Sequence, residues 1–453
     1  MSALAGMLQA RGFRVTGSDQ NVYPPISTQL EALGIELRQG FSPDHLADHP
    51  DLIVVGNAVS RANPEVQAML DRDTPFLSFP QALAEFFLRD RHPIVVVGTH
   101  GKTTTASLMA WVLEAAGLDP SYMIGGIPRN FGTNYKLGSG PFFVVEGDEY
   151  DTAFFDKGPK FLHYRPRSAI LTSVEFDHAD IYRDLEHVKE AFRRFVHILP
   201  SDGYVAAGID FPHVVDVLAS VPCRWEGYGC SAQANWRAVH IKADAEMIGF
   251  LVQHQDQPIG TIRWDLAGRH NIQNALGVIA VARRLGVSFG DIRQGMQSFA
   301  GVKRRQEVRG VAREITVIDD FAHHPTAIRE TLAGLRARYD GRRLWAIFEP
   351  RSATSRRAVF QEDFVEAFAE ADHVVIAGLF NPDTIVPEAR LAPERLAHDI
   401  ACQYAKEAVY LPTVDAIVDH VAINAQCGDV VVIMSNGGFG GIHEKLLEAL
   451  RDP

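Results

Sequence analysis

The stretch from residue 94 to residue 106, IVVVGTHGKTTTA, constrains the fold of this chain more than any other. An apolar run at 94–97 stops at a glycine, and a second glycine, Gly101, precedes an amphipathic segment that ends at Gly117. A strand, a tight glycine turn and a helix in this order point backbone N–H groups at one spot before the helix. The pattern predicts an α/β fold with an anion held at the carboxyl end of a strand.

The same loop carries the side chains that a bound triphosphate requires. Lys102 offers a positive charge to the β- and γ-phosphates, and Thr103 offers a hydroxyl to a Mg²⁺ ion. The common phosphate loop has a glycine where this chain has Val96, so we interpret the stretch as a shorter variant of that loop. The alternative is a plain strand-to-helix turn with a surface lysine, which the flanking strand and helix disfavour. We predict that a nucleoside triphosphate is bound by Gly98, Thr99, His100, Gly101, Lys102, Thr103 and Thr104.

A carboxylate and a histidine follow two further strand-like runs. Glu146 directly follows the apolar run FFVV, and His178 lies in VEFDHADIY after another such run. Ligands bind at the carboxyl ends of the strands in open parallel sheets, so both side chains are expected near the loop. We predict a metal site of Thr103, Glu146 and His178. Two general observations argue against His178 as a metal ligand. Mg²⁺ prefers oxygen ligands, and a lone histidine usually has a structural role.

Length and composition exclude several classes of protein. A chain of 453 residues predicts about three domains. The net charge of −12 argues against a broad nucleic-acid surface, and no apolar run approaches the roughly 20 residues that cross a membrane. The four cysteines lack metal-site spacing and are too few for a disulfide framework. We expect a cytoplasmic protein whose partners are small molecules, and the sequence does not predict its oligomeric state.

The order of strand-like and helix-like segments divides the chain into three blocks. Residues 1–90 alternate short strands and helices, residues 91–297 carry the loop, and residues 298–453 return to the alternation. A period-2 stretch at 237–253 predicts an antiparallel patch in the second block. The first block begins directly in a helix, without the strand and glycine turn that normally open a nucleotide-binding unit. We therefore expect its first strand to be missing from this sequence.

Six segments occur here in the order found in one enzyme family. They read GTHGKTTT, VEGDEYD, EFDHAD, GRHNIQNA, GVKRRQE and DDFAHHPTAI. Together they resemble the Mur ligases, ATP-dependent enzymes that form the amide bonds of bacterial cell-wall precursors. The resemblance covers essentially the whole chain. It implies three α/β domains: a Rossmann-like UDP-sugar-binding domain at 1–90, a phosphate-loop ATP-binding domain at 91–297 and a Rossmann-like peptide-binding domain at 298–453.

The resemblance also implies roles for individual residues. The implied catalytic residues are Lys102, Glu146 and His178, with Lys102 neutralising charge on the transferring phosphoryl group. Thr103 and Glu146 are implied to hold one Mg²⁺, and Glu146 and His178 to help hold a second. Nucleotide contacts outside the loop are implied for Asn271, Asn274, Arg305 and Asp320. Substrate contacts are implied for Asn130, Thr133, Asn134 and His323.

Other segments resemble the branch of the family that reattaches a salvaged tripeptide to UDP-N-acetylmuramate. They read NVYPPISTQLEALGIE, GGIPRNFGTNYKLG, EYDTAFFDKGPKFLHYRPR, FEPRS and MSNGGFGGIHEKLL. In the implied reaction, ATP phosphorylates the lactyl carboxylate, and the amine of L-Ala-γ-D-Glu-meso-diaminopimelate attacks the acyl phosphate. Several family members carry a carbamylated lysine after the DH motif. This chain lacks it, as the recycling and the alanine-adding branches both do, so what positions the second metal stays open.

The diaminopimelate end of such a peptide carries both a carboxylate and an ammonium. An arginine binds a carboxylate with two parallel hydrogen bonds, so Arg351, in FEPRSATSRR after an apolar run, is the predicted peptide contact. Taken singly, it is equally well explained as a solvated loop charge.

Three alternative functions stay open. The closest is the ligase that adds free L-alanine, because no motif here reads the third residue of the peptide. A nucleotide-binding sensor or kinase would use the central block alone and turn over ATP without an amine. A chain that lacks its first strand could also bind ATP but ligate weakly, since in the family the missing glycine turn contacts the UDP portion.

Overall fold

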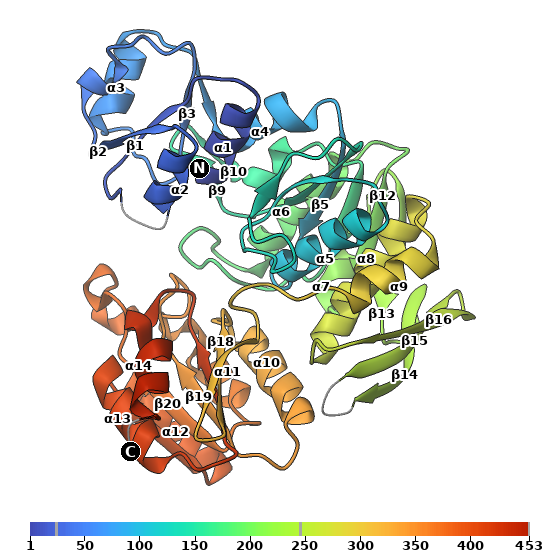
Figure 1. Cartoon of the computed structure of the whole chain (residues 1–453), viewed down its shortest axis with the longest axis vertical. Helices are drawn as coiled ribbons and strands as arrows, with labels where there is room; N and C mark the ends of the chain where they lie inside the picture. Colours follow the sequence, from blue (N-terminus) through green and yellow to red (C-terminus); the bar gives the residue numbers. More distant parts are fainter. Residues whose placement is uncertain (23–25, 244–246, 452–453) are drawn as a thin grey trace.

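Three α/β units follow one another along the chain in the computed structural model (Figure 1), which describes residues 1–22, 26–243 and 247–451. The predicted α/β class is confirmed. Tyr23, Pro24 and Pro25 of the NVYPP segment and residues 244–246 of the period-2 stretch lie outside the described residues. Within the described residues, no helix is both long and apolar enough to cross a membrane.

The first unit consists of two separate pairs of short parallel strands. One pair is β1 (Thr16–Asp19) with β2 (Glu36–Gln39), and the other is β3 (Ile53–Val55) with β4 (Phe76–Ser78). The helices of this unit are α1 (Ser2–Ala10), α2 (Ile26–Ala32) and α3 (Pro64–Asp71). The expected helical start is confirmed, since α1 opens the chain. Leu4 and Met7 of α1 belong to an apolar cluster that also contains residues of the second unit, so the two units share a core.

A ten-stranded sheet forms the second unit, and β5 (His92–Val97) lies inside it between β8 (Phe142–Glu146) and β11 (Ser168–Leu171). The strand order is β16-β15-β14-β13-β12-β11-β5-β8-β6-β7, and the strands from β14 to β6 run parallel. The other strands with parallel partners are β6 (Ser121–Met123), β12 (Tyr204–Gly208), β13 (Arg224–Gly229) and β14 (Trp236–Ala243). A short strand, β7 (Tyr135–Lys136), closes one edge, and β9 (Asp151–Ala153) and β10 (Asp156–Pro159) form a separate hairpin.

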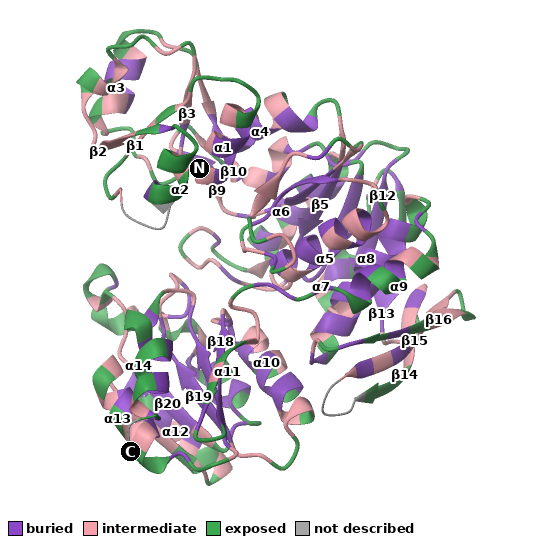
Figure 2. Ribbon diagram, viewed as in Figure 1, coloured by how far each residue is buried: buried purple, intermediate pink, exposed green. Residues whose placement is uncertain are grey.

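Alternate residues of β5 face two different apolar cores. Ile94 and Val96 pack with α5 (Lys102–Ala115), α8 (Arg269–Arg284) and α9 (Phe289–Gln297). Val95 and Val97 pack with the opposite layer, which contains α4 (Phe79–Leu83) and α6 (Leu185–His197), with α7 (Pro212–Val217) at its rim. All four side chains are fully buried, as the continuous apolar run requires of a central parallel strand (Figure 2).

The antiparallel patch predicted from the period-2 stretch is confirmed. The strands β14 (Trp236–Ala243), β15 (Ile248–His254) and β16 (Gln257–Trp264) pair antiparallel and extend the sheet at one edge.

A six-stranded sheet of order β17-β18-β22-β19-β20-β21 forms the third unit, and only β17 runs antiparallel to its neighbour. Its strands are β17 (Glu307–Ala312), β18 (Ile315–Asp320), β19 (Leu344–Phe348), β20 (His373–Ala377), β21 (Glu407–Leu411) and β22 (Val430–Met434). One face is covered by α10 (Pro325–Arg338), α11 (Gln361–Ala367) and α12 (Pro393–Tyr404). The other is covered by α13 (Val414–Asn424) and α14 (Ile442–Ala449). Buried strands between partly exposed helices are visible in Figure 2.

Candidate active site

The predicted strand, turn and helix are confirmed around the glycine-rich loop. β5 ends at Val97, and α5 begins at Lys102 directly after Gly101. Gly98 and Gly101 have φ values of 133° and 78°, which only glycine adopts without strain. The α5 N-terminus therefore directs its first backbone N–H groups into the space in front of the loop.

Lys102 is buried at the start of α5, and its charged partner is Glu149. Its Nζ donates to Glu149 Oε2 at 2.8 Å, to Glu149 Oε1 at 3.0 Å and to the Gly98 carbonyl at 2.7 Å. Burial alone would lower the pKa of Lys102, but the carboxylates of Glu149 and Asp148 outweigh it and raise that pKa. The lysine thus stays charged in a fixed position.

The pKa values of the two glutamates of VEGDEYD are shifted in opposite directions. Burial raises the pKa of Glu146 above its ordinary value. Burial acts in the same direction on Glu149, but Lys102 and His178 outweigh it, so the pKa of Glu149 is lowered. Sequence reasoning missed Glu149 as a site residue. Its place three residues after Glu146, in the same acidic segment behind a buried strand, is the signal that could have found it.

The predicted metal residues fall into two contacting groups. Thr103 Oγ1 donates to Glu146 Oε1 at 2.8 Å, and the Gly125 N–H donates to Glu146 Oε2 at 2.8 Å. His178 Nε2 instead lies 3.3 Å from Glu149 Oε1. Burial would lower the pKa of His178, yet the hydrogen bond to Glu149 and the charge of Asp177 raise it. Among the described residues, no hydrogen bond or ion pair joins Glu146 to His178, and the positive charge of Lys102 acts to lower the pKa of both.

Of the two predicted asparagines of α8, Asn274 lies against the loop and Asn271 contacts Asn274. Asn271 donates to the Ala267 carbonyl at 2.6 Å, and Asn274 donates to Asn271 Oδ1 at 3.4 Å. A Cβ at Gly101 would lie 2.7 Å from Asn274 Oδ1, so glycine is required there for a second reason. Both asparagines are buried, and their contact with adenine stays a prediction.

The third unit reaches the loop through Arg305. Its guanidinium lies 3.5 Å from Thr103 Oγ1 and 4.8 Å from the centre of the Phe321 ring. Asp320 accepts from the backbone N–H groups of Gln306 and Ala322, each at 2.8 Å. The predicted approach of this unit to the loop is therefore present, and Asp320 shapes the turn that carries Arg305. Burial raises the pKa of Asp320.

A cluster that the sequence analysis did not identify joins the same two units. His100 Nε2 lies 2.8 Å from Glu175 Oε2, and the His100 and His324 ring centres are 4.6 Å apart. His324 Nε2 contacts the Phe176 carbonyl at 3.1 Å, and its Nδ1 accepts from the Thr326 N–H at 3.3 Å. Both ring nitrogens thus have backbone partners, so we interpret the cluster as an interdomain contact rather than a metal site.

The predicted substrate residues lie in two places. Asn130 is held by the backbone of 298–300, through a 2.8 Å bond to the Ser298 carbonyl and a 2.7 Å bond from the Ala300 N–H. Thr133 Oγ1 donates to the Tyr135 carbonyl at 2.9 Å, and the Asn134 carbonyl accepts from Ile124 N–H. These contacts order the loop; its binding of the sugar acid stays a prediction.

His323 and Arg351 belong to the third unit. His323 Nδ1 lies 3.0 Å from the Phe321 carbonyl, and burial lowers the pKa of His323. The Arg351 guanidinium lies 3.6 Å from the centre of the Phe380 ring and 3.5 Å from Glu349 Oε1. Arg351 and the buried Glu349 thus place one positive and one negative side chain next to each other.

The three units match three domains of one family. Residues 1–91 match the Mur ligase family catalytic domain, residues 96–282 the Mur ligase middle domain and residues 304–437 the Mur ligase glutamate ligase domain. The chain therefore belongs to the Mur ligase family, and the predicted three-domain architecture is confirmed.

The relatives that match the chain over its full length include two kinds of ligase. UDP-N-acetylmuramate–L-alanyl-gamma-D-glutamyl-meso-2,6-diaminoheptandioate ligase of Escherichia coli (strain K12) is 43% identical, with 99% of this chain and 96% of the relative covered. UDP-N-acetylmuramate–L-alanine ligase of Geotalea uraniireducens (strain Rf4) is 35% identical, covering 100% and 96%. The crystal structure of a murein peptide ligase from Psychrobacter arcticus is 38% identical, covers 100% of this chain and 97% of its own, and has a TM-score of 0.73.

Proposed function

We propose that this chain is an ADP-forming ligase that joins L-Ala-γ-D-Glu-meso-diaminopimelate to UDP-N-acetylmuramate through an acyl phosphate, in the recycling of cell-wall peptides. The observation that best supports this proposal is the buried Lys102, which Glu149 holds in place at the N-terminus of α5. A cation and a helix N-terminus at one spot neutralise a transferring phosphoryl group. The 43% identity to the Escherichia coli tripeptide ligase supports the choice of substrates.

We propose that ATP and Mg²⁺ serve this site. The Thr103 hydroxyl and the Glu146 carboxylate are oxygen donors that suit Mg²⁺, and both already point at one another across 2.8 Å. A bound Mg²⁺ would neutralise charge on the phosphates. Lys102 and the first N–H groups of α5 orient the phosphoryl group in line with the acceptor carboxylate, and Arg305 adds a positive charge from the third unit. His178 orients Glu149 and is the proposed contributor to a second metal site.

The choice of amine rests on the third unit. Arg351 and Glu349 offer the cation and anion that a diaminopimelate zwitterion requires, and the Phe380 ring holds the Arg351 guanidinium flat. Free L-alanine is the alternative amine, favoured by the 35% identity to an L-alanine ligase.

Parallel reactions separate the two amines. The chain is incubated with ATP, Mg²⁺ and UDP-N-acetylmuramate, and phosphate release is followed with either the tripeptide or L-alanine. We expect release that depends on the tripeptide. Release that depends only on L-alanine would assign the alternative, and release without any amine would indicate a simple ATPase.

We also propose that the domains meet near residues 90 and 297, because each sheet is complete within one of the resulting segments. A cytoplasmic location is part of the proposal, since ATP and the UDP-sugar acid are substrates of that compartment.

A further inference from the structure

A pocket of about 550 Å³ lies at the amino ends of the central strands β5 and β11, opposite the end that carries the glycine-rich loop. Pro93, near the start of β5, and Arg167, just before β11, line it. The loop follows the other end of β5. At about 3.3 Å per residue, the two ends of the six-residue strand β5 lie roughly 16–20 Å apart, with the pocket at one end and the loop that leads to Lys102 at the other. None of the residues assigned above to the active site lines it.

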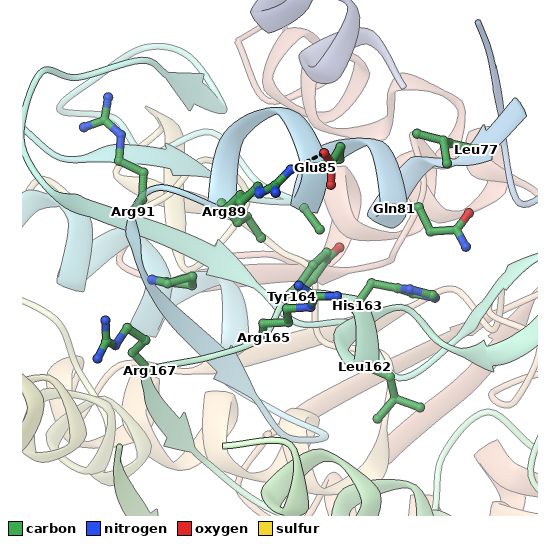
Figure 3. A pocket seen from close by; sticks show the side chains of 13 residues that line it. Leu77, Gln81, Glu85, Arg89, Arg91, Leu162, His163, Tyr164, Arg165 and Arg167 are labelled. Carbon is green, nitrogen blue, oxygen red and sulfur yellow. Dashed lines mark hydrogen bonds and ion pairs between the residues drawn. The ribbon is translucent and has the colours of Figure 1, made fainter. Parts of the chain in front are cut away.

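Two segments from different units form the walls (Figure 3). One is the helix that links the first and second units, α4 with the turn that follows it. The other is the segment 162–167 of the second unit. A molecule bound between them contacts both sides of the interdomain link.

The pocket lining is strongly basic. Its charged members are the arginines Arg89, Arg91, Arg165 and Arg167 and a single carboxylate, Glu85. The whole chain has a net charge of −12, whereas the charged side chains that line this pocket sum to a positive charge. Four guanidinium groups around one hollow are suited to a phosphate or carboxylate, which they bind with paired hydrogen bonds.

Two of the four arginines are available to a ligand. The Arg165 guanidinium has no hydrogen bond or ion pair within the described part of the chain, and Arg89 pairs only with the exposed Glu85, at 2.8 Å. By contrast, Arg91 donates to the carbonyls of Gly138 and Gly140 and fixes that loop. Figure 3 shows Arg91 and Arg167 toward one end of the pocket.

The backbone is irregular on both walls. Residues Ala84–Leu88 form a π-helical turn, closed by a 3.1 Å bond from the Arg89 N–H to the Ala84 carbonyl. Such turns are rare and occur frequently at functional sites. On the facing wall, Arg165 has a left-handed φ of 43°, an unfavourable conformation for a residue with a side chain. Each irregularity occurs at or directly beside one of the two available arginines.

Apolar side chains complete the pocket. Leu77, Leu88, Pro93 and Leu162 line it beside the arginines, together with the Tyr164 ring. The volume falls within the range of small-molecule sites, about 300–1,000 Å³. We propose that this pocket binds a phosphorylated small molecule that carries an apolar or ring moiety, and that the bound molecule bridges the link between the first two units.

Isothermal titration of the full-length protein tests the proposal. The active site is first saturated with a non-hydrolysable ATP analogue, Mg²⁺ and UDP-N-acetylmuramate. AMP is then added as a ring-bearing phosphate, and inorganic pyrophosphate as a charge-only probe. We expect AMP to bind more tightly than pyrophosphate, because only AMP also uses the apolar wall.

A double variant, Arg89→Gln with Arg165→Gln, localises the binding. Removing each guanidinium is expected to weaken AMP binding about tenfold. Arg293→Gln is the matched control, since this exposed arginine lies on α9, outside the pocket. No binding of either probe, or equal AMP affinity in the double variant and the wild type, would overturn the proposal. Both results are independent of whether the chain ligates the tripeptide.

Discussion

The two ends of β5 both offer positive charge to an anion, but they do so in opposite ways. At the carboxyl end, Lys102 is 8% exposed and faces Glu149, which is 3% exposed. At the amino end, Arg89 is 66% exposed, and Arg165 has no partner within the described residues. A buried cation with a buried counter-charge is fixed in position, and removing either partner leaves the other unpaired. Exposed arginines are free to adapt to a ligand, and removing them leaves no buried charge unpaired, since the Glu85 partner of Arg89 is itself exposed.

Lys102→Ala should have the largest effect. We expect ligation to fall by about 10²–10³-fold, or roughly 3–4 kcal/mol, because the transferring phosphoryl charge loses its cation. The free energy of unfolding should also fall, by about 3–5 kcal/mol, since Glu149 is left buried without the lysine. Steady-state phosphate release and urea unfolding measure the two effects.

The double variant Lys102→Met with Glu149→Gln separates catalysis from stability. It removes both buried charges, so the stability should largely recover while ligation stays low. Turnover near that of the wild type in Lys102→Ala would contradict the assignment of the loop.

Glu175→Gln tests the interdomain contact at the same end of β5. Burial would raise the pKa of Glu175, but the hydrogen bond and charge of His100 outweigh it and lower that pKa to about 2 from its ordinary 4.5. A lowered carboxyl pKa stabilises the fold above pH 4.5, and the stabilisation is lost as the pH falls toward 2. We expect the variant to be up to about 3 kcal/mol less stable at pH 7. Urea unfolding at pH 7 and pH 4 should show the difference shrinking, and a constant difference would mean that the charge is not responsible.

Arg351→Ala tests a cation between these two extremes, because Arg351 is partly buried and has Glu349 as its carboxylate partner. Without this guanidinium, the tripeptide KM should rise about 10- to 100-fold while the ATP KM stays unchanged. Arg356→Ala is the control, because Arg356 donates to the carbonyls of Phe380 and Asn381, each at 3.0 Å, and is structural. Equal changes in both KM values in Arg351→Ala would remove the assignment of the peptide site.

His178→Ala tests the second metal site. His178 is the proposed contributor to this site, and even the loss of a residue that only orients a metal ligand weakens metal binding about 10- to 100-fold, so half-maximal activity should require at least that much more Mg²⁺. Lys102 still holds Glu149 in this variant, and the fold should persist. An unchanged Mg²⁺ titration with full activity would leave His178 as a structural residue.

The local sequence was sufficient to predict the glycine-rich loop, but not to predict which distant residues contact it. The strand at 94–97, the glycines and the helix from Lys102 lie within one continuous segment, so their pattern predicts them directly. The contact of His324 with Phe176 joins residues 148 positions apart, and no local pattern encodes it. The same holds for the basic pocket, whose walls come from different units.

Arg167 should show the smallest effect. Its guanidinium lies 2.9 Å from Asp202, with 51% and 67% of the two side chains exposed. Exposed ion pairs contribute about 0.2–1 kcal/mol, because water screens the charges and the side chains lose conformational freedom. Arg167→Gln should therefore reduce the free energy of unfolding by less than about 1 kcal/mol and leave the kinetics of ligation unchanged. A loss as large as that of Lys102→Ala would mean that the two ends of β5 are equally rigid, and the distinction between a fixed and an adaptable anion site would fail.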